Sequence, residues 1–177
     1  MITMMNSKSF TPRLKKLFTV ILLALFGGLM YVSQVVMASL PNIELVSLLI
    51  IILARKFSFK SLAGVYIFVL CEILTYGLHI WVINYLYVWA IFAVIICLVR
   101  KIDNAVFYAV ISGAFGLAFG TLCAIPYFFT LGIAGGITYI VNGFWFDLMH
   151  CGGNFLIALI LYRPLTLVFD KALKPFI

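Results

Sequence analysis

Two short series of polar side chains, each with a carboxylate and a histidine, are the residues of this sequence best suited to chemistry. Glu72 is followed by Tyr76 and His79 at i+4 and i+7, which places all three on one face of a helix. The second series has the spacing i, i+3, i+4 and i+7 and consists of Asp147, His150, Cys151 and Asn154. Both series lie in apolar sequence, where a charged carboxylate is costly unless it is paired or hydrated. They are therefore expected to contact a ligand in a protein cavity, or to clamp helices together by hydrogen bonds with Glu72 protonated.

Polar and aromatic residues elsewhere are expected to complete the same cavity. Amide and hydroxyl groups orient a ligand by hydrogen bonds, and an aromatic ring can stack on it. The predicted substrate-binding residues are Tyr31, Gln34, Asn42, Glu44, Glu72, Tyr76, His79, Asn84, Tyr85, Asn142, Trp145, Asp147 and His150. Other aromatic residues are expected to gather at the outer ends of the helices, and most of them need no explanation beyond the aromatic belt at a membrane interface.

No enzyme or metal-binding motif is present in the sequence. HExxH, GxSxG and Walker A patterns are missing, so no catalytic residue and no ATP-hydrolysing site is predicted. The four cysteines stand singly in apolar runs, so no metal site is predicted. An intramembrane enzyme that uses Glu72, Asp147 and the two histidines ranks lowest, because acid–base catalysis needs a mutual geometry that a sequence does not give.

Composition predicts the elements that must position these residues. Of the 177 residues, 66% are hydrophobic and 10% are charged, which is too few polar residues for a surface that faces water. A helix that crosses a bilayer needs about 20 apolar residues, so the chain has room for about six. We expect an all-α, polytopic membrane protein, a six-transmembrane-helix bundle with helices at about 17–39, 43–54, 62–79, 81–99, 105–124 and 144–162. A glycine-rich, uncharged break is expected at 131–143.

The basic residues predict the orientation of this bundle. With six helices, all twelve lysines and arginines fall on one side, and basic residues stay on the cytoplasmic side of inserted helices. Both termini are therefore expected in the cytoplasm. Residues 1–177 form one membrane domain, with a basic N-terminal segment at 1–16, transmembrane helices within 17–162 and a C-terminal tail at 163–177. This topology explains the net charge of +7 and excludes a nucleic-acid-binding protein, because no basic domain lies outside the bilayer.

Small residues indicate close approach of helices at two places. Ala24 and Gly28 form a small-xxx-small pair, and Gly27 widens the notch, so a surface that docks a partner is expected on the first helix. A similar stripe in the fifth expected helix consists of Gly113, Gly116 and Gly120. For that stripe, packing inside the bundle is at least as good an explanation.

Three longer strings carry a resemblance to a known family. They are Leu40-Pro41-Asn42-Ile43-Glu44, Trp81-Val82-Ile83-Asn84-Tyr85-Leu86-Tyr87-Val88-Trp89 and Phe146-Asp147-Leu148-Met149-His150-Cys151. Together with the six expected helices, the cytoplasmic ends and the small-residue notch, they make the whole chain resemble a substrate-binding S component of an energy-coupling factor (ECF) transporter. These transporters are vitamin importers of prokaryotes, and the strings resemble the subgroup associated with cobalamin.

The resemblance implies a mechanism and a set of partners. Such a protein lies in the prokaryotic cell membrane and binds its vitamin in an outward-facing pocket, under the loops after the first, third and fifth helices. It then docks through the first helix, here Ala24, Gly27 and Gly28, onto a transmembrane coupling subunit and topples to release the cargo. Two partner ATPase subunits hydrolyse ATP with Mg, and the chain has no cofactor of its own. Gly28 stands where the family pattern has alanine, a change that close approach should survive.

Charge narrows the choice of cargo. An anionic ligand usually meets arginine, lysine or a helix N-terminus, and the outer face has no basic side chain apart from its histidines. A ligand without net negative charge, such as cobalamin, fits better. Another non-anionic vitamin, or a cationic ligand attracted to Glu72 and Asp147 such as a queuosine precursor, fits as well. A membrane scaffold protein without transport activity is the alternative from a different class.

Overall fold

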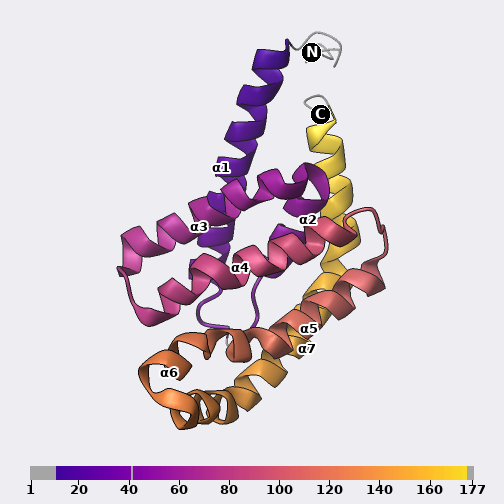
Figure 1. The fold of residues 1–177 in the computed structure, drawn as a ribbon. Helices are drawn as coiled ribbons and strands as arrows, with labels where there is room; N and C mark the ends of the chain where they lie inside the picture. The colour runs from indigo at the N-terminus through magenta and orange to yellow at the C-terminus, as the bar shows by residue number, and fades with distance from the viewer. Residues whose placement is uncertain (1–10, 41, 175–177) are drawn as a thin grey trace.

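Helices make up nearly all of the structure, a computed structural model that describes residues 11–40 and 42–174 (Figure 1). In chain order they are α1 (Pro12–Val36), α2 (Val46–Phe57), the 3-10 turn η2 (Ser58–Lys60), α3 (Ser61–Tyr76), α4 (Ile80–Val99), α5 (Ala105–Cys123), the short α6 (Ile125–Thr130) and α7 (Gly132–Leu173). Side-chain caps begin two of them: the Thr11 hydroxyl accepts a hydrogen bond from Leu14 N in α1, and Asn104 does the same for Phe107 N in α5. The described part contains no strand, which confirms the all-α class.

Within residues 11–40 and 42–174, five helical segments are long and apolar enough to cross a membrane. They are Pro12–Val36, Val46–Tyr76, Ile80–Val99, Ala105–Thr130 and Gly132–Leu173. The second of these joins α2 and α3 through η2, where Ser58 has a positive φ of 53°. At 1.5 Å per residue, the twelve residues of α2 extend only about 18 Å, short of the hydrocarbon core of a bilayer. The structure therefore supports a multi-pass membrane protein, and the count of six crossings does not follow from helix length.

The interior of the fold is built around α2. All residues from Val46 to Ala54 are buried, and the segment is apolar on every side apart from Ser47. A helix that is hydrophobic all round belongs in the middle of a bundle, and α2 packs against α1, α3, α4 and α7.

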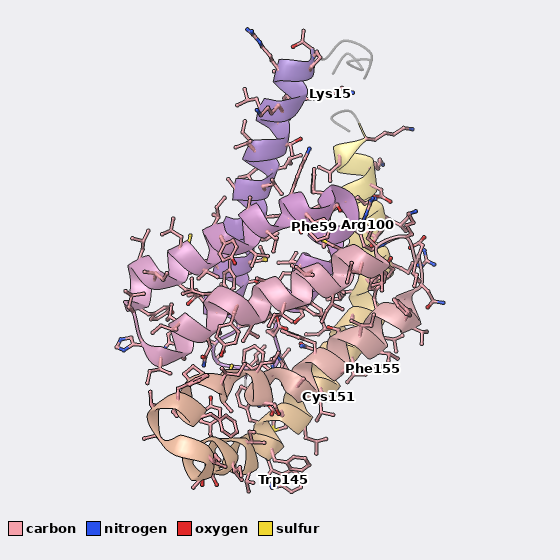
Figure 2. The ribbon with its side chains drawn as sticks, in the orientation of Figure 1. Lys15, Phe59, Arg100, Trp145, Cys151 and Phe155 are labelled. Atoms are coloured by element: carbon pink, nitrogen blue, oxygen red, sulfur yellow. The ribbon has the colours of Figure 1, made fainter. Side chains whose placement is uncertain are left out.

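Helix α7 pairs with α5 along much of its length and connects the two ends of the molecule (Figure 1). The start of α1 and the end of α7 lie at the same end, whereas α6 and the first turns of α7 lie at the other. Figure 2 shows the same polarity in side chains, with Lys15 near the first end and Trp145 near the second. The stripe of small residues in α5 faces α7: a Cβ at Gly116 would lie 2.7 Å from the carbonyl oxygen of His150. Packing inside the bundle therefore explains this stripe.

Several predicted helix bounds are wrong. The break expected at 131–143 is helical, because α7 begins at Gly132 and its first turns pack on α6, where Gly136 lies directly against the ring of Phe128. The tail expected from residue 163 is also helical as far as Leu173, since Phe169 packs on Phe26 with ring centroids 4.7 Å apart.

The other helix bounds differ by a few residues. Helix α1 starts at Pro12 instead of 17 and ends at Val36, and α2 covers Val46–Phe57 instead of 43–54. Helix α3 ends at Tyr76 instead of 79, because Gly77, with φ of 78°, stops it. The parts of the expected terminal segments at 1–10 and 175–177, and Pro41 of the first family-like string, lie outside the described residues.

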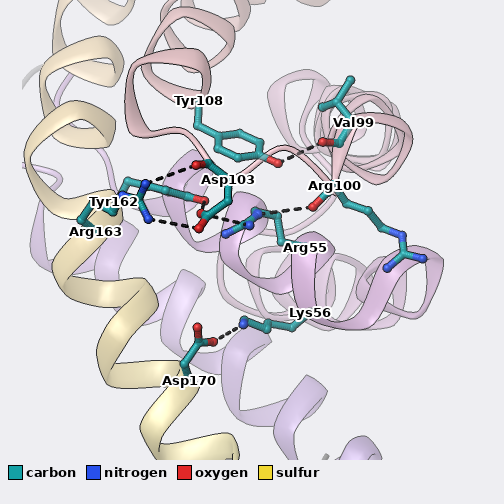
Figure 3. Close-up of polar contacts among 9 residues, drawn as sticks. All are labelled: Arg55, Lys56, Val99, Arg100, Asp103, Tyr108, Tyr162, Arg163 and Asp170. Carbon is teal, nitrogen blue, oxygen red and sulfur yellow. Dashed lines mark hydrogen bonds and ion pairs between the residues drawn. The ribbon is translucent and has the colours of Figure 1, made fainter.

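A polar network joins three parts of the chain at the basic end (Figure 3). Asp103, between α4 and α5, forms ion pairs of 3.1 Å with Arg55 of α2 and with Arg163 of α7. The Tyr162 hydroxyl donates to Asp103 Oδ1 over 2.8 Å. Lys56 and Asp170 form a second ion pair between α2 and α7. Three of the basic residues that predicted the orientation, Arg55, Lys56 and Arg163, thus also join the end of α2, the loop between α4 and α5, and α7.

We expect a small pH-dependent contribution to stability from Asp103. The hydrogen bond from Tyr162, together with the charges of Arg55 and Arg163, lowers the pKa of Asp103 below its ordinary value. The stabilisation is therefore present above that ordinary value, near pH 4, and is lost as the pH falls through the lower folded-state pKa. Because Asp103 is half exposed, the effect should be about 1 kcal/mol or less. Thermal unfolding of the wild type and Asp103→Asn should differ most near neutral pH and converge in acid; a constant difference would contradict this account.

Candidate functional site

A cavity of about 620 Å³ lies between α4, α5, α6 and α7, at the end opposite the polar network. Its lining is mostly aromatic and small residues: Trp81, Asn84, Tyr85, Phe119, Gly120, Cys123, Tyr127, Leu131, Gly135, Thr138, Tyr139, Asn142, Gly143, Phe146 and Asp147. A concave, largely apolar space of this size with a few polar groups is the usual form of a small-molecule site.

Asp147 is the only carboxylate among the described residues that line this cavity. Its side chain is 4% exposed, and Oδ1 accepts a hydrogen bond of 2.9 Å from the backbone N–H of Gly120 on α5. A Cβ at residue 120 would overlap both carboxylate oxygens, so glycine is needed there for the approach. Among the described residues, no lysine or arginine pairs with Asp147, and Oδ2 accepts no hydrogen bond. The carboxylate therefore keeps acceptor capacity for a ligand.

Asn84 also lines the cavity, but its polar atoms are already used. Its Nδ2 donates to the carbonyl oxygen of Cys123 over 3.2 Å. The Tyr87 hydroxyl lies 2.9 Å from Asn84 Oδ1 and 2.8 Å from the carbonyl oxygen of Leu122. These contacts join α4 to the C-terminal end of α5, so Asn84 fixes the wall of the cavity.

Aromatic rings form two sides of the cavity. On α4, Trp81 and Tyr85 meet edge to face with centroids 5.5 Å apart. Tyr127 of α6, also in the lining, stacks on Tyr139 of α7 with centroids 4.3 Å apart. Such rings supply flat apolar area and electron-rich faces for a ligand.

A second polar cluster joins the loop before α2 to α7. Glu44 accepts hydrogen bonds from the backbone N–H and the hydroxyl of Ser47, and it lies 3.6 Å from His150 Nε2. Asn154 Nδ2 donates to the Ser47 hydroxyl over 3.2 Å. Burial by itself would raise the pKa of Glu44, but the contacts with His150 and Ser47 outweigh it and lower that pKa. This cluster orders the loop and lies outside the cavity lining.

In the structure, the residues of the Glu72 series and those of the Asp147 series have different surroundings. On α3, Glu72 is 0% exposed and accepts no hydrogen bond from the described residues, whereas Tyr76 and His79 are exposed at the helix end. On α7, Asp147 lines the cavity, whereas His150 belongs to the Glu44 cluster. The single shared cavity wall expected from helical spacing is therefore not formed.

The remaining predicted residues have diverse places. Tyr85 and Asn142 line the cavity, and Gln34 interacts with the Tyr85 hydroxyl from outside the lining. Tyr31 hydrogen-bonds to Thr75 over 2.7 Å. Asn42 approaches Met149 Sδ at 3.9 Å, and Trp145 is 70% exposed. Of the predicted residues, those that the structure places in the cavity lining are Asn84, Tyr85, Asn142 and Asp147.

Sequence reasoning missed part of the lining because it placed a break before α7. Once the helix starts at Gly132, the lining residues Gly135, Tyr139, Asn142 and Phe146 follow one another at spacings of four, three and four. That is the repeat of one helix face. This spacing is present in the sequence, but it was not recognised because the glycines were interpreted as a loop.

The small residues of α1 divide between two roles. Gly27 is buried against α3, where an added Cβ would lie 2.7 Å from the carbonyl oxygen of Gly64. Ala24 is exposed, and a Cβ at Gly28 would meet nothing within 4 Å. Gly27 is therefore needed for internal packing, and the face with Ala24 and Gly28 is open.

Comparison of the chain with protein-family models, with curated proteins and with solved structures finds no match. The candidate site therefore rests on its own geometry. Within the described residues, no group of three or more histidines, cysteines and carboxylates is placed to hold a metal ion.

Proposed function

We propose that the chain is the membrane-embedded substrate-binding subunit, or S component, of an ECF-type transporter in a prokaryotic cell membrane. It captures a small molecule from outside and delivers it through a coupling subunit and two ATPases. The observation that carries the proposal is the cavity with a buried carboxylate and aromatic walls, located at the end of the helices opposite the basic residues. A scaffold protein would have no need for such a cavity.

The proposed topology has six crossings and both termini in the cytoplasm. It rests on the charge pattern, because Arg55, Lys56, Asp103 and Arg163 meet at one end while the cavity opens near the other. In this topology α2 is a short, central crossing, and the cavity faces the external side. Alkylation of single cysteines placed at Lys101 and at Thr138 in intact cells should label only the second; the reverse result would contradict this orientation.

Cobalamin is the cargo that the family resemblance favours, and a smaller non-anionic compound such as a queuosine precursor is the second candidate. The described residues that line the cavity include no lysine, arginine or histidine, which disfavours an anionic cargo. The volume of about 620 Å³ lies within the usual range for drug-sized ligands, about 300–1,000 Å³. A corrinoid is larger than such ligands, so cobalamin would require the α6 end to open further. The cavity volume thus favours the smaller candidate.

A growth experiment tests the proposed function. Auxotrophic cells without their own importers would receive this gene with the coupling module and would be grown on a panel of limiting vitamins and precursors. Rescue by one non-anionic compound, dependent on both the gene and the ATPases, is the expected result. Rescue by pantothenate alone would overturn the choice of cargo class. Absence of any rescue, with no ATPase pair bound to the purified protein, would favour the scaffold alternative.

We predict that Gly28→Leu abolishes the complex with the coupling subunit while cargo binding remains. Leucine at this open position fills the notch that close helix approach requires, and the cavity is formed by other helices. Co-purification of the coupling subunit should fall by about five- to 150-fold, the loss expected for a wedge that costs about 1–3 kcal/mol. Ala118→Leu, at an exposed position of α5, serves as the matched control and should leave the complex intact. Equal loss in both variants would contradict the docking role.

A further inference from the structure

We propose that the cavity between α4, α5, α6 and α7 selects an organic cation: a compound with a flat apolar body and a positively charged nitrogen held by Asp147 and the surrounding aromatic rings. The inference rests on the proposed role in ligand capture and goes beyond it by naming the chemical class of the cargo. Its basis is the combination of one unpaired carboxylate with aromatic walls in a lining that has no basic side chain.

The charge of Asp147 calls for a positive partner. A carboxylate buried in a membrane protein is costly unless it is paired with a positive group. Here the backbone N–H of Gly120 satisfies one oxygen, and no lysine or arginine of the described chain reaches the other. The nearby imidazole of His150 is directed to Glu44, at 3.6 Å. A cationic ligand would supply the missing positive partner.

The aromatic residues of the lining also favour a cation. Trp81 and Tyr85 of α4, together with Tyr127 of α6 and Tyr139 of α7, line the same cavity as Asp147. The faces of such rings attract a cation within about 6 Å, most strongly where water is excluded. A flat ligand body can also stack between them. The rings and the carboxylate thus favour the same ligand charge.

The same lining should select among ligands of different charge. A neutral ligand of equal shape would gain the stacking and would leave Asp147 unpaired. An anion would meet a carboxylate with no basic side chain to offset it. The lining therefore discriminates by charge as well as by size. It also explains Gly120, since a side chain at that position would displace the carboxylate from the wall.

Three probes of similar shape test the proposal: 1-methylquinolinium as the cation, quinoline as the neutral compound and quinoline-4-carboxylate as the anion. The full chain is reconstituted in lipid nanodiscs, and binding near neutral pH is measured by equilibrium dialysis, with empty nanodiscs as the blank. We expect the cation to bind at least about tenfold more tightly than quinoline, and the anion to bind most weakly. If the cation binds no more tightly than quinoline, or does not bind, the inference is wrong.

Asp147→Asn then locates the effect. The amide oxygen can still accept from Gly120, so the variant removes the charge with little change of shape. We expect the preference for the cation over quinoline to disappear in this variant and to persist in Asp103→Asn, which removes a carboxylate outside the cavity lining, in the network with Arg55 and Arg163. A preference that survives Asp147→Asn would overturn the role of Asp147. The proposed function is judged separately, by co-purification with the coupling subunit and ATPases, which does not depend on any probe.

Discussion

Replacement of Asp147 by alanine is expected to lower cargo uptake at least about tenfold. The carboxylate is the only one in the cavity lining, and its Oδ2 has no hydrogen-bond donor among the described residues. Loss of one partner of a buried charged contact typically costs 2–5 kcal/mol, which is more than a tenfold change in binding. The measurement is initial uptake of cargo by cells that express the coupling module, with the amount of protein in the membrane determined in parallel.

Cys97→Ala is the matched control for this variant. Cys97 is also buried, on α4, but it lies outside the cavity and near Ser61, with 3.8 Å between Sγ and Oγ. Its replacement tests the effect of a small packing defect without loss of a ligand contact. We expect it to change uptake much less than Asp147→Ala does. Equal effects, or full recovery of uptake in the Asp147→Ala variant at lower temperature, would mean that Asp147 only joins α5 to α7.

The global character of the fold could be predicted because it depends on composition and on long apolar runs. The run from Leu48 to Ala54 has no polar residue, and the structure buries all of it. The ends of α4 and α5 agree with the predicted ones within one residue, because the polar segment 100–104 separates them. In both cases the pattern is local, so the helices can be predicted from the sequence.

The helix at 131–143 could not be predicted from local preferences. Glycine weakens a helix by up to about 1 kcal/mol relative to alanine, and Gly135, Gly136 and Gly143 argue for a loop on that basis. The structure uses the absence of a side chain at Gly136 to bring α7 against Phe128 of α6. Tertiary packing thus outweighs the local preference. The part of the cavity formed by Gly135, Thr138 and Tyr139 depends on this helix and was not predicted without it.

Helical spacing correctly placed Asp147, His150 and Asn154 on one face of α7 but did not predict which site each forms, and Cys151 of the same series is only partly buried. Asp147, His150 and Asn154 are all buried, as one stripe should be. However, the stripe meets different neighbours along its length: α5 at Asp147, and the loop before α2 at His150. On α3 the same rule placed Tyr76 with Glu72, but Glu72 is buried, whereas Tyr76 is 42% exposed and contacts the ring of Trp81. A spacing rule gives a direction around one helix and contains no information about what that direction meets.

The second large effect is expected for Gly116→Val, which should separate α5 from α7. A Cβ at this position would lie 2.7 Å from the carbonyl oxygen of His150 and 2.9 Å from the backbone nitrogen of Cys151. Backbone atoms cannot rotate away as a side chain can, so the two helices must move apart. Overpacking of a core typically costs 1–3 kcal/mol, and we expect at least about 3 kcal/mol here, because the contact extends along the largest helix pair of the fold. Since Gly120 and Asp147 lie one turn further along the same interface, ligand binding should be lost with stability.

Gly152→Val provides the comparison for this prediction, because it adds the same side chain to α7 at a position where a Cβ meets nothing within 4 Å. Valine is no worse than glycine in a helix, so this variant should unfold at or slightly above the temperature of the wild type. Thermal unfolding in detergent, followed by the fraction of protein that remains monodisperse, measures both. A stability loss in Gly116→Val that is no larger than in Gly152→Val would contradict the close approach of α5 and α7. Because the cavity wall is built across that same approach, such a result would also remove the basis for placing Asp147 at the site.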